Sequence, residues 1–536
     1  MLLLKNANVI TLDENMPHAD YMLIEDGRII HLGAGNPDEA AGKIAAGGSY
    51  EVIDLKGHTI IPGFWESHLH IIDGTRSLME LNLRDCTSIV SLKKRIDIYR
   101  ASIAPGEWII GHGWNETLLF SGKFPDRHLL DSLCDSNPMV LIRMDGHSVC
   151  INSKAMDAVD TDWMNTEDEI PFGNDGLPAG MLYENAASRI LEIVSNSLSD
   201  SYIETIVLKA QQLFIENGIT SVNDICTGRG RCFDIYNKLQ RENKLKLRIT
   251  ASPKGLDKNS IAEFEKRKQH QTSRLKVGPP KFFIDGSFGS RTALLFKGYA
   301  DEPDNTGLKL ISDDELITVI ASNAEIKQPI NIHAIGDYAV ASVLDAYENT
   351  GVDFIYEDIR GRIEHIQIIR EKDIDRFKQF NIAASFQPVF LFEKELTNNR
   401  VGNDRLKEVY RFNSLIESGA NVIFNSDWPY GGDSFPQKPD STGYIGFEPL
   451  LGMYSACCNQ FNSSEAVSPL IALKCYTTNP AYANYMEQEL GRLQNGFLAD
   501  FVVLSHNPLN CKQEEIKEIE VLMTVINGEI VYNKLD

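Results

Sequence analysis

The sequence predicts an α/β protein: a TIM-like (β/α)8 barrel with a small β-sandwich domain and a large insertion. Three observations lead to this prediction. Strand-like and helix-like segments alternate through the middle of the chain, which is typical of parallel α/β folds. Strand-like segments without helices occur at both ends, and a long stretch interrupts the alternation after the first barrel strand.

Eight segments have the short apolar character of buried parallel strands. Helical segments lie between most of them, as at residues 203–217, 313–325 and 371–379. Eight strands that alternate with helices in this way favour a barrel over an open sheet. The first of the eight ends at His70, and the others are residues 219–226, 246–252, 281–285, 330–333, 362–365, 382–386 and 422–425.

The two ends of the chain carry too few strands to form a core each. We therefore expect residues 1–59 and 488–536 to pair into one small β-sandwich domain, with the barrel of residues 60–487 between them. The strand-like segments are residues 2–12, 21–24, 28–32 and 50–55 at one end and 501–504, 521–526 and 529–532 at the other.

Residues 71–201 form an interval much longer than a βα connection usually needs. This length predicts an inserted subdomain. Because it follows the first strand, we expect it to cover the face of the barrel that carries active sites and to shape substrate access.

The formal charge is −23, from 52 Lys and Arg against 75 Asp and Glu. Binding to nucleic acid or to an anionic membrane normally requires a basic surface, so we expect neither partner. We find no signal peptide, no stretch of membrane-spanning length, and no disulfide-scaffold spacing among the nine cysteines. We expect a cytoplasmic protein with a small-molecule substrate, and we leave a homodimer open.

Four histidines and one aspartate fall at the C-terminal ends of candidate strands, where barrels carry their catalytic residues. His68 and His70 end the first strand, and alternate side chains of a strand share a face. His333 ends the fifth strand, His365 ends the sixth, and Asp427 follows the eighth. Imidazole and carboxylate ligands suit Zn²⁺, although Mn or Fe also binds such sites. We therefore expect a metal site here.

The surrounding motifs, taken in order, resemble those of the amidohydrolase superfamily. They are most similar to its YtcJ-like branch, which includes N-substituted formamide deformylase, and the similarity covers essentially the whole chain. Glu66 stands where that family commonly has Asp, and Trp65 replaces a smaller apolar residue. The motifs are Pro62-Gly-Phe-Trp-Glu-Ser-His-Leu-His, Gly146-His-Ser, Asp285-Gly-Ser-Phe-Gly-Ser-Arg-Thr-Ala, Ile332-His-Ala-Ile-Gly-Asp, Arg362-Ile-Glu-His and Ser426-Asp-Trp-Pro.

The resemblance implies two metal ions per chain, with zinc as the first expectation. It assigns His68, His70 and Asp427 to one ion and His333 and His365 to the other. It also implies that Lys281, on the fourth strand, is carboxylated and bridges the two ions, because an ammonium group would repel both. An unmodified Lys281 beside a single ion is the alternative. Asp427 would take the proton from the attacking water and return it to the departing amine.

We therefore expect a metal-dependent hydrolase that cleaves a C–N bond other than a peptide bond. The expected substrate is an amide, an N-substituted formamide or a cyclic amide. Hydrolytic deamination or lactone hydrolysis at the same site is the alternative within enzymes. A metal-free barrel that binds a small molecule without turnover is the alternative outside them.

Two residues of the insertion are weaker candidates for contact with the substrate. His147 could donate to a carbonyl oxygen or a carboxylate of the substrate, or it could lie in a surface loop. Trp114 could line the pocket, or it could pack in a core. Beyond the fourth strand, we expect Asp285 and Arg291 to hold their glycine-rich loop together rather than to touch the substrate.

Overall fold

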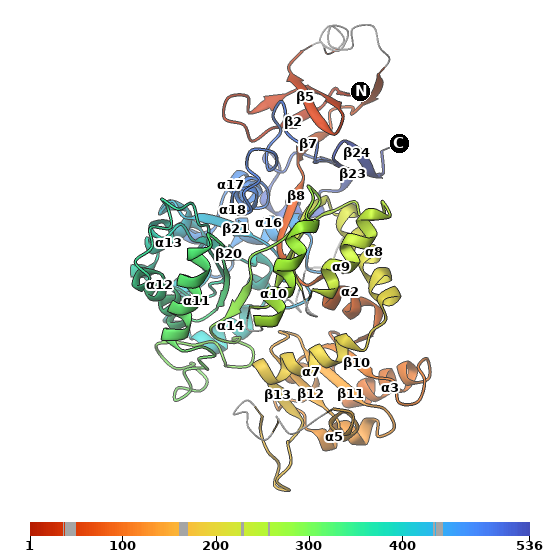
Figure 1. Ribbon diagram of the computed structural model, residues 1–536, viewed down its shortest axis with the longest axis vertical. Helices are drawn as coiled ribbons and strands as arrows, with labels where there is room; N and C mark the ends of the chain where they lie inside the picture. Colours follow the sequence, from red (N-terminus) through yellow and green to blue (C-terminus); the bar gives the residue numbers. More distant parts are fainter. Residues whose placement is uncertain are drawn as a thin grey trace.

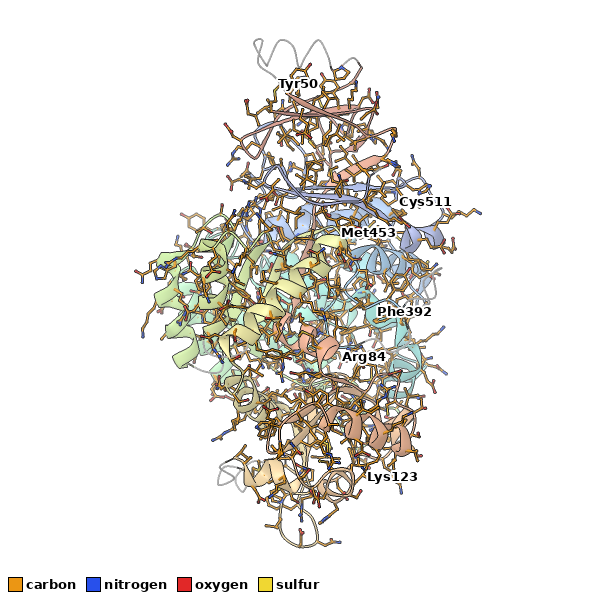
Figure 2. The ribbon with its side chains drawn as sticks, turned by 90° about the vertical axis from the view of Figure 1, so that its right-hand side faces the viewer. Tyr50, Arg84, Lys123, Phe392, Met453 and Cys511 are labelled. Carbon is orange, nitrogen blue, oxygen red and sulfur yellow. The ribbon has the colours of Figure 1, made fainter. Side chains whose placement is uncertain are left out.

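The computed structural model describes residues 1–35, 37, 50–159, 164, 170–226, 230–255, 258–431, 435 and 443–535. Figure 1 shows three tiers along the longest axis of the molecule: the strands of both termini, a body of parallel strands and helices, and the inserted segment. Figure 2 shows the same order from the side, with Tyr50 near one end and Lys123 near the other. None of the helices among the described residues combines the length and the apolar character needed to cross a bilayer.

Strands from both ends of the chain share one sheet. β7 pairs in parallel with β2 and antiparallel with β22, in a six-stranded sheet of order β24-β23-β22-β7-β2-β3. A second sheet has the order β5-β4-β1-β6. The apolar core of this region draws on both termini, as Leu4, Val9, Phe501 and Val525 show. The strands are β1 (Leu2–Lys5), β2 (Asn8–Ile10), β3 (His18–Ala19), β4 (Tyr21–Glu25), β5 (Arg28–Gly33), β6 (Glu51–Asp54), β7 (Thr59–Pro62), β22 (Phe501–Leu504), β23 (Val521–Ile526) and β24 (Glu529–Asn533).

The strand predicted to end at His70 is two strands in two different sheets. β7 belongs to the sheet of the termini, and β8 (Phe64–Leu69) belongs to the body. The predicted boundary at residue 59 is therefore displaced to Gly63. A side chain at Gly63 would lie 2.3 Å from Oγ1 of Thr220, so only glycine lets the chain pass from one sheet to the other at this point.

Two parallel sheets form the body, with the orders β16-β15-β14-β8 and β17-β18-β19-β20-β21. Each of the eight segments predicted as barrel strands overlaps one of these strands. β16 was not predicted; it is a short strand that Gly278, Pro279 and Pro280 separate from β17. The strands are β14 (Ile219–Cys226), β15 (Arg248–Pro253), β16 (Leu275–Val277), β17 (Lys281–Phe283), β18 (Asn331–Ala334), β19 (Arg362–His365), β20 (Ala383–Phe386) and β21 (Asn421–Phe424).

Contacts join the two parallel sheets at both of their edges. Lys254 forms a parallel bridge with Lys281 on one side. On the other side, the Ser67 hydroxyl donates to the carbonyl oxygen of Phe424 at 3.1 Å. These contacts bring the strands that carry the candidate ligands close to one another.

The helices of the body follow the strands in sequence, and several start at a capping serine. Ser312 and Glu315 form a capping box at the start of α11, and Ser199 caps α8. The predicted helix at residues 371–379 is a 3-10 turn followed by a short α13. The helices are α2 (Ile71–Met79), α8 (Asp200–Glu216), α9 (Arg231–Arg241), α10 (Lys258–Arg267), α11 (Asp313–Glu325), α12 (Asp337–Asn349), α13 (Arg376–Gln379), α14 (Lys394–Val401), α15 (Phe412–Glu417), α16 (Pro449–Cys458), α17 (Pro469–Cys475) and α18 (Thr478–Ala483).

The insertion has a mixed five-stranded sheet of order β13-β12-β11-β10-β9 and two apolar clusters of its own. α2, the first helix of the predicted insertion, packs against α8 and belongs to the body. The sheet of the insertion therefore begins only at Leu81. Residues 160–163 and 165–169 of the predicted insertion lie outside the described residues. The elements are β9 (Leu81–Asn82), α3 (Ile89–Arg100), β10 (Ile109–Trp114), α4 (Glu116–Leu119), α5 (Arg127–Leu133), β11 (Met139–Arg143), β12 (Ser148–Ile151), α6 (Ser153–Asp157), β13 (Met181–Tyr183) and α7 (Glu184–Asn196).

Candidate metal centre

Three predicted ligands form a compact buried cluster. The ligand atoms of His68, His365 and Asp427 lie within 4.8 Å of one another. Oδ1 of Asp427 is 3.3 Å from Nε2 of His68 and 3.3 Å from Nε2 of His70. The C-terminal ends of β8, β19 and β21 place these side chains, as expected for a site at the carboxyl ends of parallel strands.

The backbone is strained at two of these residues. His365 has a φ of 81° and Asp427 has a φ of 56°, in a region that non-glycine residues rarely adopt. The structure holds Asp427 by a hydrogen bond from its backbone N to the carbonyl oxygen of His68, at 2.9 Å. Such strain persists only where neighbouring contacts fix it, and it is concentrated at functional sites.

Lys281 and His333 complete the predicted set. Nζ of Lys281 is 3.2 Å from Nε2 of His68, and the rings of His333 and His365 have centroids 4.4 Å apart. Nε2 of His333 donates to the carbonyl oxygen of Gly286 at 3.0 Å. Because a protonated nitrogen cannot bind a cation, His333 offers only Nδ1 as a ligand.

Two side chains that the sequence analysis missed orient the histidines. Oε2 of Glu364 lies 2.8 Å from Nδ1 of His68, and Oε1 of Gln387 accepts from Nδ1 of His365 at 2.9 Å. A proton on Nδ1 of each ring would face these oxygens and leave Nε2 unprotonated, as metal binding requires. Glu364 is fully buried, and no spacing in the sequence relates it to His68.

Burial sets the protonation of the cluster. It lowers the pKa of His68, His333 and His365, so these imidazoles are neutral at physiological pH. Burial also lowers the pKa of Lys281 to about 8, against the opposing charges of nearby carboxylates. For Asp427, burial acts to raise the pKa, but the nearby imidazoles of His68 and His70 lower it overall.

The cluster fits a divalent cation. Oδ1 of Asp427 is buried and has no hydrogen-bond donor among the described residues. It faces the unprotonated Nε2 of His68, so two electron-rich atoms meet at 3.3 Å. A cation between them would remove this repulsion, and imidazole with carboxylate is a ligand set that zinc accepts.

Glu66 connects the two strand ends that carry these ligands. Its Oε1 accepts from the backbone N of His68 and of Ser426, at 3.1 Å in each case. Burial raises the pKa of Glu66 to about 8, against those two hydrogen bonds. The glutamate that replaces the usual aspartate therefore braces the site without reaching the cluster itself.

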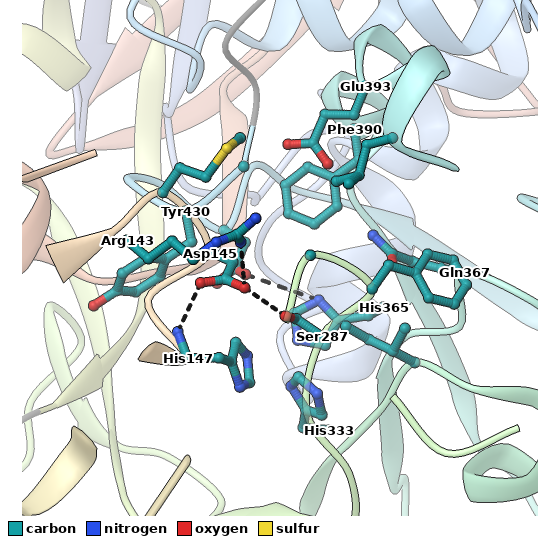
Figure 3. Close-up of a pocket in the computed structure, with 17 residues that line it drawn as sticks. Arg143, Asp145, His147, Ser287, His333, His365, Gln367, Phe390, Glu393 and Tyr430 are labelled. Atoms are coloured by element: carbon teal, nitrogen blue, oxygen red, sulfur yellow. Dashed lines mark hydrogen bonds and ion pairs between the residues drawn. The ribbon is translucent and has the colours of Figure 1, made fainter. Parts of the chain in front are cut away.

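A narrow pocket opens beside the cluster, between the body and the insertion. It leaves about 40 Å³ for water-sized molecules, which is room for roughly three waters. Figure 3 shows the ring of His147, from the insertion, beside the ring of His333; the centroids are 4.9 Å apart. The other lining residues include Arg143, Met144, Asp145, Ser287, Phe288, His365, Phe390, Glu393, Leu396, Asp427 and Tyr430.

His147 is paired with a carboxylate that the sequence analysis did not single out. Its Nδ1 is 2.7 Å from Oε2 of Glu184. Burial acts to lower the pKa of His147, but the charge and the hydrogen bond of Glu184 raise it to about 9. The raised pKa favours the doubly protonated ring, in which Nδ1 faces Glu184 and Nε2 is left to donate.

The structure does not bring Trp114 to the site. Its ring is fully buried among apolar residues of the insertion, and its Nε1 donates to the carbonyl oxygen of Leu141 at 2.9 Å. Asp285 accepts from three backbone N–H groups, those of residues 294, 335 and 336, and Arg291 pairs with Asp301. Both residues hold their loop together, as expected.

Comparisons with known proteins give matches along almost the whole chain. A family described as "Amidohydrolase family" matches residues 51–532. Protein LONG AFTER FAR-RED 3 of Arabidopsis thaliana is 30% identical, over 99% of this chain and 91% of its own. Putative amidohydrolase YtcJ of Bacillus subtilis is 28% identical, over 98% of both chains, and N-substituted formamide deformylase of Arthrobacter pascens is 24% identical, over 99% and 98%.

A solved structure also matches along almost the whole chain. An uncharacterized metal-dependent hydrolase from Pyrococcus horikoshii has a TM-score of 0.74 and 27% sequence identity, covering 96% of this chain and 99% of its own. The similarity therefore includes the termini and the insertion as well as the parallel sheets.

Proposed function

Because the chain belongs to the amidohydrolase family, as its motifs indicated, we propose that it is a metal-dependent hydrolase that cleaves a C–N bond of an amide. One observation carries the proposal: the Oδ1 atom of Asp427 lies at equal distance from Nε2 of His68 and of His70, at the ends of two parallel strands. This arrangement can hold a divalent ion beside a carboxylate that can accept a proton.

Zinc is the ion that we propose, held by His68, His70 and Asp427, with His365 beside them. A second ion would bind His333 through Nδ1 and His365, with carboxylated Lys281 between the two ions. When bound, a divalent ion acts as a Lewis acid on a carbonyl oxygen and lowers the pKa of water to about 7.

The side chains of this protein move the proton and hold the substrate. Oδ1 of Asp427 lies closest to His68 and His70, so Oδ2 is the atom that accepts the proton from the attacking water. Asp427 then donates that proton to the departing nitrogen, which prevents the expulsion of an amide anion. His147, with both ring nitrogens protonated, also lines the pocket and donates to the substrate oxygen.

The dimensions of the pocket favour a small acyl group. Space for a few waters beside Asp427 accommodates a formyl group. Phe288, Phe390 and Leu396 line the pocket and suit an apolar substituent on the nitrogen. An N-substituted formamide is therefore the substrate that we propose, and the similarity to a formamide deformylase supports it.

We also propose that the strands of the two parallel sheets other than β16 form one closed eight-stranded barrel. The bridge between Lys254 and Lys281 and the hydrogen bond from Ser67 to Phe424 support closure at the two edges. Closure would set the ligand-bearing ends of β8 and β21 next to each other, which the metal site requires.

Hydrolysis of a panel of N-formyl, N-acyl and cyclic amides with added Zn²⁺ or Mn²⁺ tests the proposal. We expect turnover of an N-formyl substrate, bound metal in the wild type, and loss of both in His68→Asn. His112→Asn is the control, because His112 is a buried histidine of the insertion outside the pocket. Turnover only of amino-heterocycles or of lactones would favour the alternative reactions, and a wild type that binds no metal would refute the proposal.

A further inference from the structure

Glu184 contacts two elements of the site, although it lines no part of the pocket. Its Oε2 is 2.7 Å from Nδ1 of His147 in the insertion. Its Oε1 accepts from Oγ1 of Thr292 at 2.6 Å, in the loop that follows β17. The side chain is 2% exposed, so both carboxylate oxygens are withdrawn from water and are bonded within the protein.

The backbone of Glu184 is held in an unfavourable conformation. Its φ is 44°, a left-handed value that costs free energy in any residue with a side chain. The backbone N of Glu184 donates to the carbonyl oxygen of His147 at 2.8 Å. Backbone and side chain therefore hold the same histidine, and the strain at the start of α7 is the consequence of both contacts.

A glycine on the opposite side leaves the space for the carboxylate. A side chain at Gly286 would lie 2.0 Å from Oε1 of Glu184 and 2.1 Å from Oγ1 of Thr292. The carbonyl oxygen of Gly286 accepts from Nε2 of His333. Glu184 thus fixes His147 relative to the loop that also contacts a predicted metal ligand.

We propose that Glu184 is the positioning residue for His147: it holds Nδ1, so that Nε2 is the nitrogen that meets the substrate oxygen. The inference rests on the proposed function for the role of His147 in the reaction. Without Glu184, the ring of His147 can rotate about its χ angles and present either nitrogen. Nε2 would then be aligned with the substrate oxygen for only part of the time. A carboxylate that merely braced the fold would have no effect on this alignment.

Glu184→Gln is the test variant, because it keeps the shape of the side chain and removes its charge. The chain offers a matched control in Glu80, whose Oε2 is 2.8 Å from Nε2 of His112. This second pair is also buried, but it lies outside the pocket. His147→Asn identifies the signals of His147.

The first readout is independent of catalysis. In protein with ¹⁵N-labelled histidine, the Nδ1 proton of His147 should resonate downfield, because it is shared with a carboxylate. We expect this signal to be lost in His147→Asn, to move upfield in Glu184→Gln, and to be unchanged in Glu80→Gln. An unchanged signal in Glu184→Gln would overturn the proposal.

The second readout is the hydrolysis of N-(4-nitrophenyl)formamide, which releases a coloured amine. Glu184→Gln should lower kcat about 10- to 100-fold, with KM within a factor of about two, and the double variant with His147→Asn should show little further loss. Additive losses would overturn the proposal. If the wild type hydrolyses no amide, the proposed function fails, and the NMR signal still decides whether Glu184 holds His147.

Discussion

Replacement of Lys281 by methionine tests whether an unmodified lysine is tolerated at the centre of the site. Burial lowers the pKa of Lys281 from 10.5 to about 8, although Glu364 and Asp427 favour its charged form. One pKa unit corresponds to about 1.4 kcal/mol, so the charged lysine destabilises the folded protein by about 3 kcal/mol at neutral pH. Methionine has a similar length and carries no charge, so Lys281→Met should stabilise the metal-free protein.

The direction of the pKa shift of Lys281 determines how the stabilisation by Lys281→Met depends on pH. The folded-state pKa of Lys281 lies below the unfolded value, so the folded state binds fewer protons between pH 8 and pH 10.5. The destabilisation is fully present below pH 8. It decreases as the pH rises and disappears above the unfolded value, where the amine is neutral in both states. The stability advantage of Lys281→Met should therefore disappear by about pH 10.5.

Calorimetry of both proteins with a chelator and without bicarbonate measures the difference. At pH 7 we expect Lys281→Met to melt a few degrees higher. With Zn²⁺ and bicarbonate the order should reverse, because only the wild type can form the carbamate and gain from metal binding. Equal melting temperatures at pH 7, or a variant that melts lower there, would refute the reasoning.

Three further predictions concern the ligands and the termini. Asp427→Asn should lose most hydrolysis and keep the metal at His333 and His365, because an amide cannot accept the proton; loss of all metal would contradict this. Glu364→Gln should weaken metal binding about 10- to 100-fold in a chelator competition, and unchanged affinity would exclude the orienting role. Deletion of residues 521–536 removes β23 and β24 and should make the protein insoluble, and unchanged melting would contradict the shared β-domain.

The strands of the body were accessible from the sequence because each is a short apolar run. β14 and β19 have the predicted bounds, residues 219–226 and 362–365. The crossing at Gly63 was not accessible, because the apolar run continues through it and only the contact with Thr220 shows that two sheets meet there. Periodicity describes a segment and not the sheet to which the segment belongs.

The ligand residues were predicted for a similar reason. Whether a residue lies at the end of a strand can be predicted from the nearby sequence alone. This criterion identifies His68, His70, His333, His365 and Asp427. The residues that orient them depend on contacts between distant segments. Glu364 reaches His68 from another strand. Glu184 follows β13, which pairs with the strand that His147 precedes, so no spacing in the sequence reveals either pair.

The orientation of His333 connects the number of metal ions with the state of Lys281. Nε2 of His333 is committed to Gly286, so the ligands that already converge are those around Asp427. An ammonium on Lys281, 3.2 Å from Nε2 of His68, would repel any cation bound there. Carboxylation removes that charge and adds oxygen ligands at the same place. A second ion and a modified lysine would therefore stabilise each other, and a single ion with an unmodified lysine would be the less favourable combination.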